Sequence, residues 1–302
     1  MNKLAFVAAA SLALAASAQP AGAQTLKDAL NALRLKWNAP TEPFRMIGNI
    51  HYVGTDGLAS YLVTGPDGHV LIDTVLPEGT GQIKANIVKL GFKLADIKLI
   101  LNTHGHFDHT GGLAEMKADT GAQLVVGAAD KPLIEGGYYP GQETETELAF
   151  PPVKVDRTVA DGDVVSVGRV SLTAHATPGH SPGCTTWTTK VQEAGQEHGV
   201  VFFCSGTVAL NRLVTNPTHP GIADDYRSTF ERAPRIAGDV LLAPHPEMYG
   251  MAAKRARLAD GGPNPFVVPG EFQAYLAKLR GEFEASLAKQ QAAAAAAAGT
   301  PK

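Results

Sequence analysis

The stretch Asn102-Thr103-His104-Gly105-His106-Phe107-Asp108-His109-Thr110-Gly111-Gly112 carries the densest chemical information in the chain. It follows the apolar run Ile97-Lys98-Leu99-Ile100-Leu101, which is typical of a buried strand. Glycines close the stretch on its far side, where a turn is expected. Three histidines and one aspartate therefore fall within six positions on a loop at the end of a strand.

The spacing within this loop suits metal ligands. His104 and His106 are two positions apart and can project from one side of an extended backbone. Asp108 and His109 then turn towards a second point nearby. Imidazole nitrogen and carboxylate oxygen both bind zinc at about 2.0–2.2 Å, so one loop can supply part of two neighbouring sites. Closing either site requires further histidines beyond other strand ends.

Two downstream histidines meet this requirement. His180 lies in the turn-rich stretch at residues 175–183, after the strand-like residues 170–174. His245 lies directly after the apolar residues 240–243 and Pro244. A lone histidine is more often structural, but six ligand-type side chains at three strand ends predict a site for two metal ions. The other histidines are predicted to be structural or solvated: His51, His69, His175, His198 and His219.

The HxHxDH stretch, its two downstream histidines and the glycine pair resemble the metallo-β-lactamase superfamily, and subclass B3 most closely. The resemblance runs from about residue 30 to residue 280. Its other supporting stretches are Trp37-Asn38, residues 47–54, residues 59–63, residues 175–187 and residues 204–211.

The resemblance implies an enzyme with two Zn²⁺ ions per chain. His104, His106 and His180 would bind the first ion, and Asp108, His109 and His245 the second. Such enzymes hydrolyse the β-lactam amide of penicillins, cephalosporins and carbapenems through a metal-bound hydroxide, which Asp108 would hold in line as the catalytic residue.

Four further residues have less certain roles. Ser205 and Thr207 match substrate-binding positions of subclass B3, with capping of a strand-to-helix turn as the alternative. Trp37 is expected either to line the pocket or to lie in the core. Asp73 follows an apolar run and either orients a metal-bound histidine or caps a turn.

Other activities share the HxHxDH signature, including lactone hydrolases, nucleases and thioester hydrolases that resemble glyoxalase II. These enzymes usually add a bridging aspartate in a Gly-Asp pair, where this chain has Cys204-Ser205-Gly206-Thr207. A non-catalytic zinc-binding protein is the remaining alternative, and it predicts a closed site with four ligands per metal. Three ligands per metal favour an enzyme.

The first 23 residues read as a secretory signal peptide. A short positive start precedes an apolar segment, and small residues allow cleavage after Ala18 or, preferably, after Ala23. A short membrane anchor is the alternative, but the segment is too short to span a bilayer. We therefore expect a periplasmic protein with no stable membrane insertion after cleavage.

In an exported protein we expect Cys184 and Cys204 to form a disulfide, because an oxidising compartment favours a bond between them. Some B3-like enzymes have a bridge at the matching positions. The competing interpretation makes Cys204 a thiolate ligand of the metal.

Composition and sequence pattern also bear on the kind of partner, the fold class and the domain limits. The 302 residues are 44% hydrophobic with a net charge of −3, so no overall basic field favours nucleic acid. The family resemblance implies small-molecule β-lactam substrates. The pattern predicts an α/β or α+β fold, and the resemblance specifies a four-layer αβ/βα sandwich. One domain is expected at residues 24–288, in halves 24–152 and 153–288, with a disordered alanine-rich tail at 289–302. A flexible rim of the active site is expected at residues 135–152.

Local patterns also predict the separate elements. Helices are predicted at residues 26–37, 79–90, 113–120, 226–236 and 272–287. Strands are predicted at residues 47–53, 59–64, 70–73, 97–101, 123–127, 164–167, 170–174, 185–189, 200–203 and 240–243. A polar turn is predicted at residues 192–199.

Overall fold

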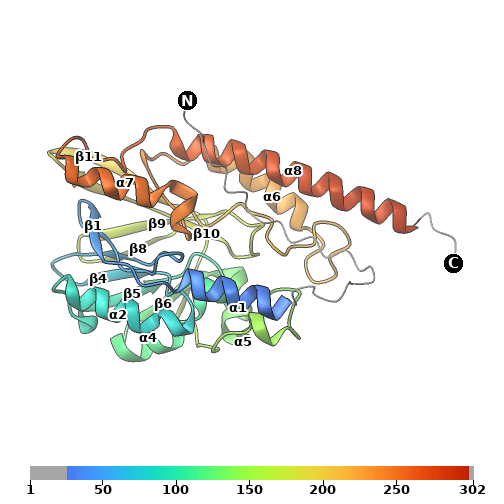
Figure 1. The fold of residues 1–302 in the computed structure, drawn as a ribbon, viewed down its shortest axis with the longest axis horizontal. Coiled ribbons are helices and arrows are strands. Elements are labelled where there is room, and N and C mark those ends of the chain that lie inside the picture. The colour runs from blue at the N-terminus through green and yellow to red at the C-terminus, as the bar shows by residue number, and fades with distance from the viewer. Residues whose placement is uncertain (1–25, 299–302) are drawn as a thin grey trace.

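The computed structural model describes residues 26–298, so the predicted signal peptide lies outside the described residues. Two sheets face each other, and helices cover the outer face of each (Figure 1). This arrangement confirms the predicted mixed α/β fold of four layers. No helix within the described range is long and apolar enough to cross a membrane.

The first sheet has seven strands in sequential order. They are β1 (Phe44–Ile47), β2 (Ile50–Tyr52), β3 (Tyr61–Val63), β4 (His69–Ile72), β5 (Ile97–Leu101), β6 (Gln123–Gly127) and β7 (Arg157–Val159). Strands β1 to β4 pair antiparallel, whereas β4 to β7 pair parallel. The carboxyl ends of β4, β5 and β6 therefore meet at one edge of the sheet.

The second sheet has five strands in the order β12-β11-β10-β9-β8. They are β8 (Val164–Val167), β9 (Val170–Ala176), β10 (Thr185–Glu193), β11 (Gln196–Phe202) and β12 (Val240–Leu242). The pairing is antiparallel except between β11 and β12, which run parallel. The loops after β9, β11 and β12 carry the predicted downstream site residues.

The helices form the two outer layers (Figure 1). Beside the first sheet lie α1 (Leu26–Trp37), α2 (Thr80–Lys89), α4 (Leu113–Thr120) and α5 (Lys131–Gly136). Beside the second sheet lie α6 (Ile222–Arg232), α7 (Met251–Arg257) and α8 (Glu271–Ala298). A single helical turn, α3 (Phe107–Thr110), completes the loop after β5.

Alternation along the strands of the first sheet divides the core. Ile72 and Leu101 belong to one buried cluster with Trp187 of the second sheet. Leu71 and Ile100 belong to a second cluster with the apolar faces of α2 and α4. Successive strand residues point to opposite faces, so one sheet contributes to both layers of core.

The structure corrects one predicted strand and one predicted turn. The strand predicted at residues 47–53 is a hairpin, because Gly48 adopts a φ of +52° and reverses the chain between β1 and β2. The polar turn predicted at residues 192–199 is shorter, since β10 and β11 continue until Glu193 faces Gln196. Polar side chains there lie on an exposed hairpin, where Lys190 and Glu197 form an ion pair of 2.7 Å.

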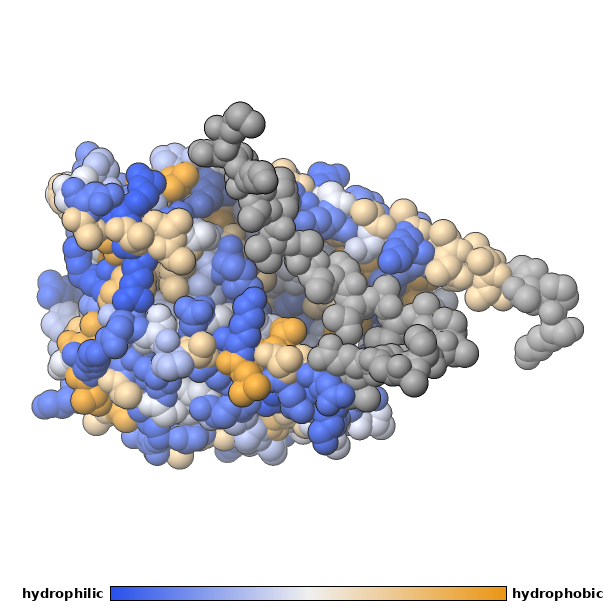
Figure 2. Space-filling view, viewed as in Figure 1, coloured by the Kyte–Doolittle hydropathy of each residue, from blue (hydrophilic) through white to orange (hydrophobic). Residues whose placement is uncertain are grey.

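The predicted helical boundaries also change near the C-terminus. The helix predicted at residues 226–236 is α6 (Ile222–Arg232), because Pro234 cannot continue its hydrogen-bonding pattern. The prediction of a disordered tail from residue 289 is wrong as far as residue 298, because α8 continues to Ala298. Alanine has the highest helix propensity, so an alanine run extends a helix that packing has already formed. Figure 2 shows this end of α8 projecting from the body of the molecule.

Cys184 and Cys204 form the predicted disulfide. It joins the start of β10 to the segment after β11, and both cysteines are almost fully buried. The alternative interpretation of Cys204 as a thiolate ligand is therefore wrong, since the sulfur is bonded to another sulfur.

Replacing both cysteines by alanine should lower the free energy of unfolding by about 3 kcal/mol, because a cross-link across about 20 residues restricts the unfolded chain. Urea denaturation of the double variant and the parent protein measures the difference. Zinc content should stay the same in both. Detection of two free thiols in the unreduced native protein would contradict the bridge.

Candidate metal centre

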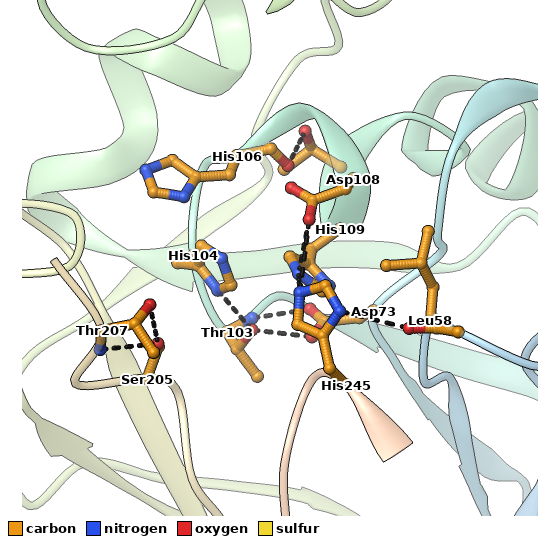
Figure 3. Close-up of polar contacts among 12 residues, drawn as sticks. Leu58, Asp73, Thr103, His104, His106, Asp108, His109, Ser205, Thr207 and His245 are labelled. Carbon is orange, nitrogen blue, oxygen red and sulfur yellow. Dashed lines mark hydrogen bonds and ion pairs between the residues drawn. The ribbon is translucent and has the colours of Figure 1, made fainter. Parts of the chain in front are cut away.

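The predicted metal loop begins where β5 ends. His104 and His106 precede α3, and His106 has extended backbone dihedral angles. Helix α3 then turns the chain so that Asp108 and His109 face the same space (Figure 3). The Thr110 hydroxyl donates a 2.7 Å hydrogen bond to the carbonyl oxygen of His106 and closes this turn. The local geometry is thus set within eight residues of the strand.

His104, His106 and His180 form the first cluster. One ring nitrogen from each lies within 4.8 Å of the others. The ring centroids are 4.5–4.8 Å apart, and all three side chains are buried. The structure therefore brings together the predicted first set.

Asp108, His109 and His245 form the second cluster. The Asp108 Oδ2 atom lies 3.3 Å from His109 Nε2 and 3.4 Å from His245 Nε2. The two Nε2 atoms are 3.3 Å apart. The clusters are neighbours, because the His104 and His109 ring centroids are 4.4 Å apart. Six potential ligands thus surround two adjacent points.

Hydrogen bonds on the outer side turn the histidine rings inward. His180 Nδ1 lies 2.7 Å from the Thr207 carbonyl oxygen, and His245 Nδ1 lies 3.1 Å from the Gly57 carbonyl oxygen. A carbonyl can only accept, so each Nδ1 carries the proton and each Nε2 keeps a free lone pair. Such outer contacts orient metal-binding histidines in many proteins.

Asp73 orients the imidazole ring of His104 through the Thr103 hydroxyl. The Asp73 carboxylate accepts hydrogen bonds from the Asn102 side-chain amide, the Thr103 backbone N–H and the Thr103 hydroxyl, at 2.7–2.9 Å. Because the hydroxyl donates to Asp73, it accepts from His104 Nδ1 at 2.9 Å. Between the two roles left open for Asp73, the geometry favours that of orienting a histidine.

Burial also sets the charge of the site. Burial raises the pKa of Asp73 to about 6 and lowers the pKa of His180 to about 4. Burial and neighbouring histidines hold the pKa values of His104 and His106 well below the usual value. Burial opposes charge on Asp108, but His109 and His245 outweigh it and lower the pKa of that carboxyl. The first cluster therefore offers neutral imidazoles and the second adds one carboxylate.

These donors fit zinc. The Nε2 atoms of His104 and His106 are buried without a hydrogen-bond partner among the described residues. A buried nitrogen that lacks a partner is unfavourable, and a bound cation would satisfy such lone pairs. Three donors in each cluster leave a coordination position open, unlike a closed structural site.

Ser205 and Thr207 lie beside the first cluster. Their hydroxyl oxygens are 3.3 Å apart, and the Thr207 backbone N–H donates to the Ser205 hydroxyl at 3.3 Å (Figure 3). No helix begins directly after them, since α6 starts at Ile222. Turn capping at a strand-to-helix junction is therefore not their role here.

Two aromatic side chains line the centre. Trp37, at the end of α1, lies beside His245 with ring centroids 5.3 Å apart. It also packs against the second core cluster, so both expected roles are met. Tyr139 stacks on His106 at 4.1 Å with an interplanar angle of 18°. Tyr139 belongs to residues 135–152, which were predicted to form the rim, and its aromatic pair with Tyr138 is the signal in the sequence that marks it.

A polar network behind Thr207 was not predicted from the sequence. The Asn211 side-chain amide donates to the His180 carbonyl oxygen at 2.9 Å. The Tyr226 hydroxyl donates to the Thr207 carbonyl oxygen at 2.7 Å. Gln290 of α8 bonds the backbone at Asn211 and Leu213. The partners are distant in sequence, so no local pattern indicated them.

The remaining histidines lie outside both clusters, as predicted. His51 and His69 contact the Phe92 ring edge-on. Elsewhere, His175 bonds Thr188, His198 bonds Asp239 and His219 bonds Asp225.

Comparisons with known proteins agree with this geometry. The family model of the metallo-beta-lactamase superfamily matches residues 53–245. The crystal structure of BJP-1, a subclass B3 metallo-beta-lactamase of Bradyrhizobium japonicum, is 62% identical and superposes with a TM-score of 0.84. That match covers 85% of this chain and 98% of the other. FEZ-1 from Legionella gormanii is 38% identical with a TM-score of 0.81, covering 84% of this chain and 98% of the other.

Matches to curated proteins are shorter. Hydroxyacylglutathione hydrolase of Rhodospirillum rubrum is 38% identical over 84 residues, which span 28% of this chain and 26% of that enzyme. The human persulfide dioxygenase ETHE1 is 30% identical over 60% of this chain and 59% of its own length. The family model and the two crystal structures cover far more, and on their evidence this chain belongs to the metallo-β-lactamase superfamily, with subclass B3 enzymes among its most similar solved structures.

Proposed function

We propose that this protein is a zinc-dependent β-lactamase of the subclass B3 type, which hydrolyses the β-lactam amide of penicillins, cephalosporins and carbapenems. The observation that carries the proposal is the pair of adjacent three-ligand clusters, in a chain 62% identical to BJP-1 across 98% of that enzyme. The substrates are small molecules, and all six proposed metal ligands belong to this chain.

His104, His106 and His180 would hold one zinc ion, and Asp108, His109 and His245 a second. When bound, zinc acts as a Lewis acid and lowers the pKa of a coordinated water towards about 7. The outer nitrogens of His104, His180 and His245 are already hydrogen-bonded, so these three donor atoms need no rearrangement. Asp108 supplies the carboxylate beside both clusters and is the proposed catalytic residue.

Ser205 and Thr207 are the proposed substrate-binding residues. Their hydroxyls lie close enough to act together on one anionic group, and the Thr207 backbone also anchors His180. The carboxylate of a β-lactam is a suitable partner, because hydroxyl hydrogen bonds to a charged group are worth more than those to a neutral one.

A thioester or lactone hydrolase is the second candidate, favoured by the match to hydroxyacylglutathione hydrolases. Against it, the position of the bridging aspartate in such enzymes is occupied here by Ser205, which follows the disulfide-bonded Cys204. A non-catalytic zinc-binding protein fits less well, since each cluster offers three ligands rather than four.

We also propose export to the periplasm. Residues 1–23 combine a positive start, an apolar segment and small residues before the cleavage site. The mature chain would then be a single domain of two αβ halves, meeting near residue 152. A disulfide between Cys184 and Cys204 is in keeping with an oxidising compartment.

Carbapenem hydrolysis by the purified mature protein tests the proposal directly. We expect loss of the β-lactam ultraviolet absorbance, abolished by a chelator and restored by added zinc. A protein that retains two zinc ions but leaves penicillins, cephalosporins and carbapenems intact would contradict the assignment. A panel of lactones and thioesters would then identify the second candidate.

Replacing His245 by alanine should reduce bound zinc from two ions to one per chain, because the second cluster loses one of three ligands. Turnover should fall by about a hundredfold or more, the loss typical of removing one electrostatic stabiliser of a transition state. Elemental analysis and steady-state kinetics measure both. Two zinc ions remaining in the variant would rule out His245 as a ligand.

Replacing Ser205 by alanine should raise KM by about ten- to a hundredfold with little change in kcat, since one hydrogen bond to a charged group is worth about 1.5–3 kcal/mol. Ser166 on β8 is the matched control, because its hydroxyl bonds only Ser171 at 2.7 Å among the described contacts. An unchanged KM for Ser205→Ala would remove this residue from the substrate site.

A further inference from the structure

Asp130 is a buried carboxylate for which the proposed reaction has no direct use. It ends a 3-10 turn, η3 (Ala128–Asp130), that follows β6, and its side chain is only 1% exposed. A charged group is rarely buried this deeply without strong hydrogen bonds, because leaving water is costly. Its contacts therefore indicate why the chain keeps a carboxylate here.

Both carboxylate oxygens of Asp130 are used. Oδ2 accepts hydrogen bonds from the Gly105 backbone N–H at 2.7 Å and the Ser181 hydroxyl at 2.6 Å. Oδ1 accepts from the Gly183 backbone N–H at 2.6 Å. All three distances are short, as expected for donors that face a carboxylate.

The donors belong to the two loops that carry the first cluster. Gly105 lies between His104 and His106 on the loop after β5. Ser181 directly follows His180 on the loop between β9 and β10. One side chain thus joins a loop of the seven-stranded sheet to a loop of the five-stranded sheet, immediately beside the histidines.

The packing leaves little room for adjustment. A Cβ atom at Gly183 would lie 2.3 Å from the Asp130 backbone nitrogen and 2.8 Å from the Asp130 Cβ atom. A Cβ atom at Gly105 would lie 3.5 Å from the Asp130 carboxyl carbon. The loop at Gly183 is therefore packed tightly against Asp130, whereas Gly105 keeps an ordinary van der Waals distance from the carboxyl group.

Asp73 makes the comparable contacts at the end of β4, where it binds residues 102 and 103. The loop after β5 therefore has one buried aspartate on each side. Asp73 reaches only that loop and His104, whereas Asp130 also reaches the loop of His180. Of the two, only Asp130 connects all three ligands of the first cluster.

We propose that Asp130 is a positioning residue that sets the distance between His180 and the pair His104 and His106, and so selectively determines zinc affinity at the first cluster. The inference rests on the proposed metal binding but not on the identity of the substrate. Outer partners of metal ligands typically contribute about ten- to a hundredfold in metal affinity.

The test measures zinc binding at each cluster separately. His245→Ala leaves the first cluster as the complete site, and His180→Ala leaves the second. Asp130→Asn is added to each background, because an amide replaces one acceptor oxygen by an NH₂ group that faces a donor. Zinc affinity is measured by competition with a chromophoric chelator.

We expect Asp130→Asn to weaken zinc binding by about ten- to a hundredfold in the His245→Ala background and to leave it unchanged in the His180→Ala background. Asp156→Asn is the matched control, because Asp156 also accepts a backbone N–H, from Leu124 at 2.8 Å, but at the opposite end of β6. It should leave both affinities unchanged.

An equal loss in both backgrounds, or no loss in the first, would overturn the proposal. If Asp130→Asn fails to fold, Ser181→Ala removes one donor and should weaken the first cluster alone, and no loss there is equally contradictory. A parent protein that binds two zinc ions without hydrolysing β-lactams would refute the proposed substrate while leaving this test intact.

Discussion

The site depends on the parallel pairing of β4, β5 and β6, which places three strand ends at one edge of a sheet. The second sheet must then be held against that edge, because His180 and His245 belong to it. Buried hydrogen bonds do this close to the site: the Tyr61 hydroxyl donates to the Ala243 carbonyl oxygen at 2.6 Å, and the Ala59 N–H donates to that of Pro244 at 2.8 Å. A shift between the sheets would therefore separate the two halves of both clusters.

Concentrating six ligands at a buried point has an energetic cost. Each buried ring nitrogen without a partner loses its hydrogen bonds to water, and like-charged histidines could not be tolerated so close together. Burial prevents the repulsion between charged histidines, because it lowers the pKa values of the first-cluster histidines and keeps them neutral. The ring nitrogens without hydrogen-bond partners remain unfavourable until a cation binds, so metal binding and folding stability are coupled.

The six candidate ligands could be predicted because their signal is local: each follows an apolar strand, and the family resemblance assigned them to two sets. The contacts that orient them were not predictable from local pattern. Asp130 and Ser181 are 51 positions apart, and Gln290 lies 79 positions from the Asn211 carbonyl that it binds. Only the folded sheets bring such residues together. The errors in secondary structure had local causes, a glycine that reverses the chain at residue 48 and an alanine run that extends α8.

Helix α8 links the far end of the domain to the loop behind Thr207. Gln290 forms hydrogen bonds with the backbone of that loop, and the helix continues for eight further residues to Ala298. At about 1.5 Å per residue, this projection forms a spacer of about 12 Å with few rotatable degrees of freedom. A spectroscopic probe attached at the end of the helix would move together with the backbone at residues 211–213. The position of such a probe would report displacement of the loop at residues 211–213 without modification of the proposed catalytic side chains.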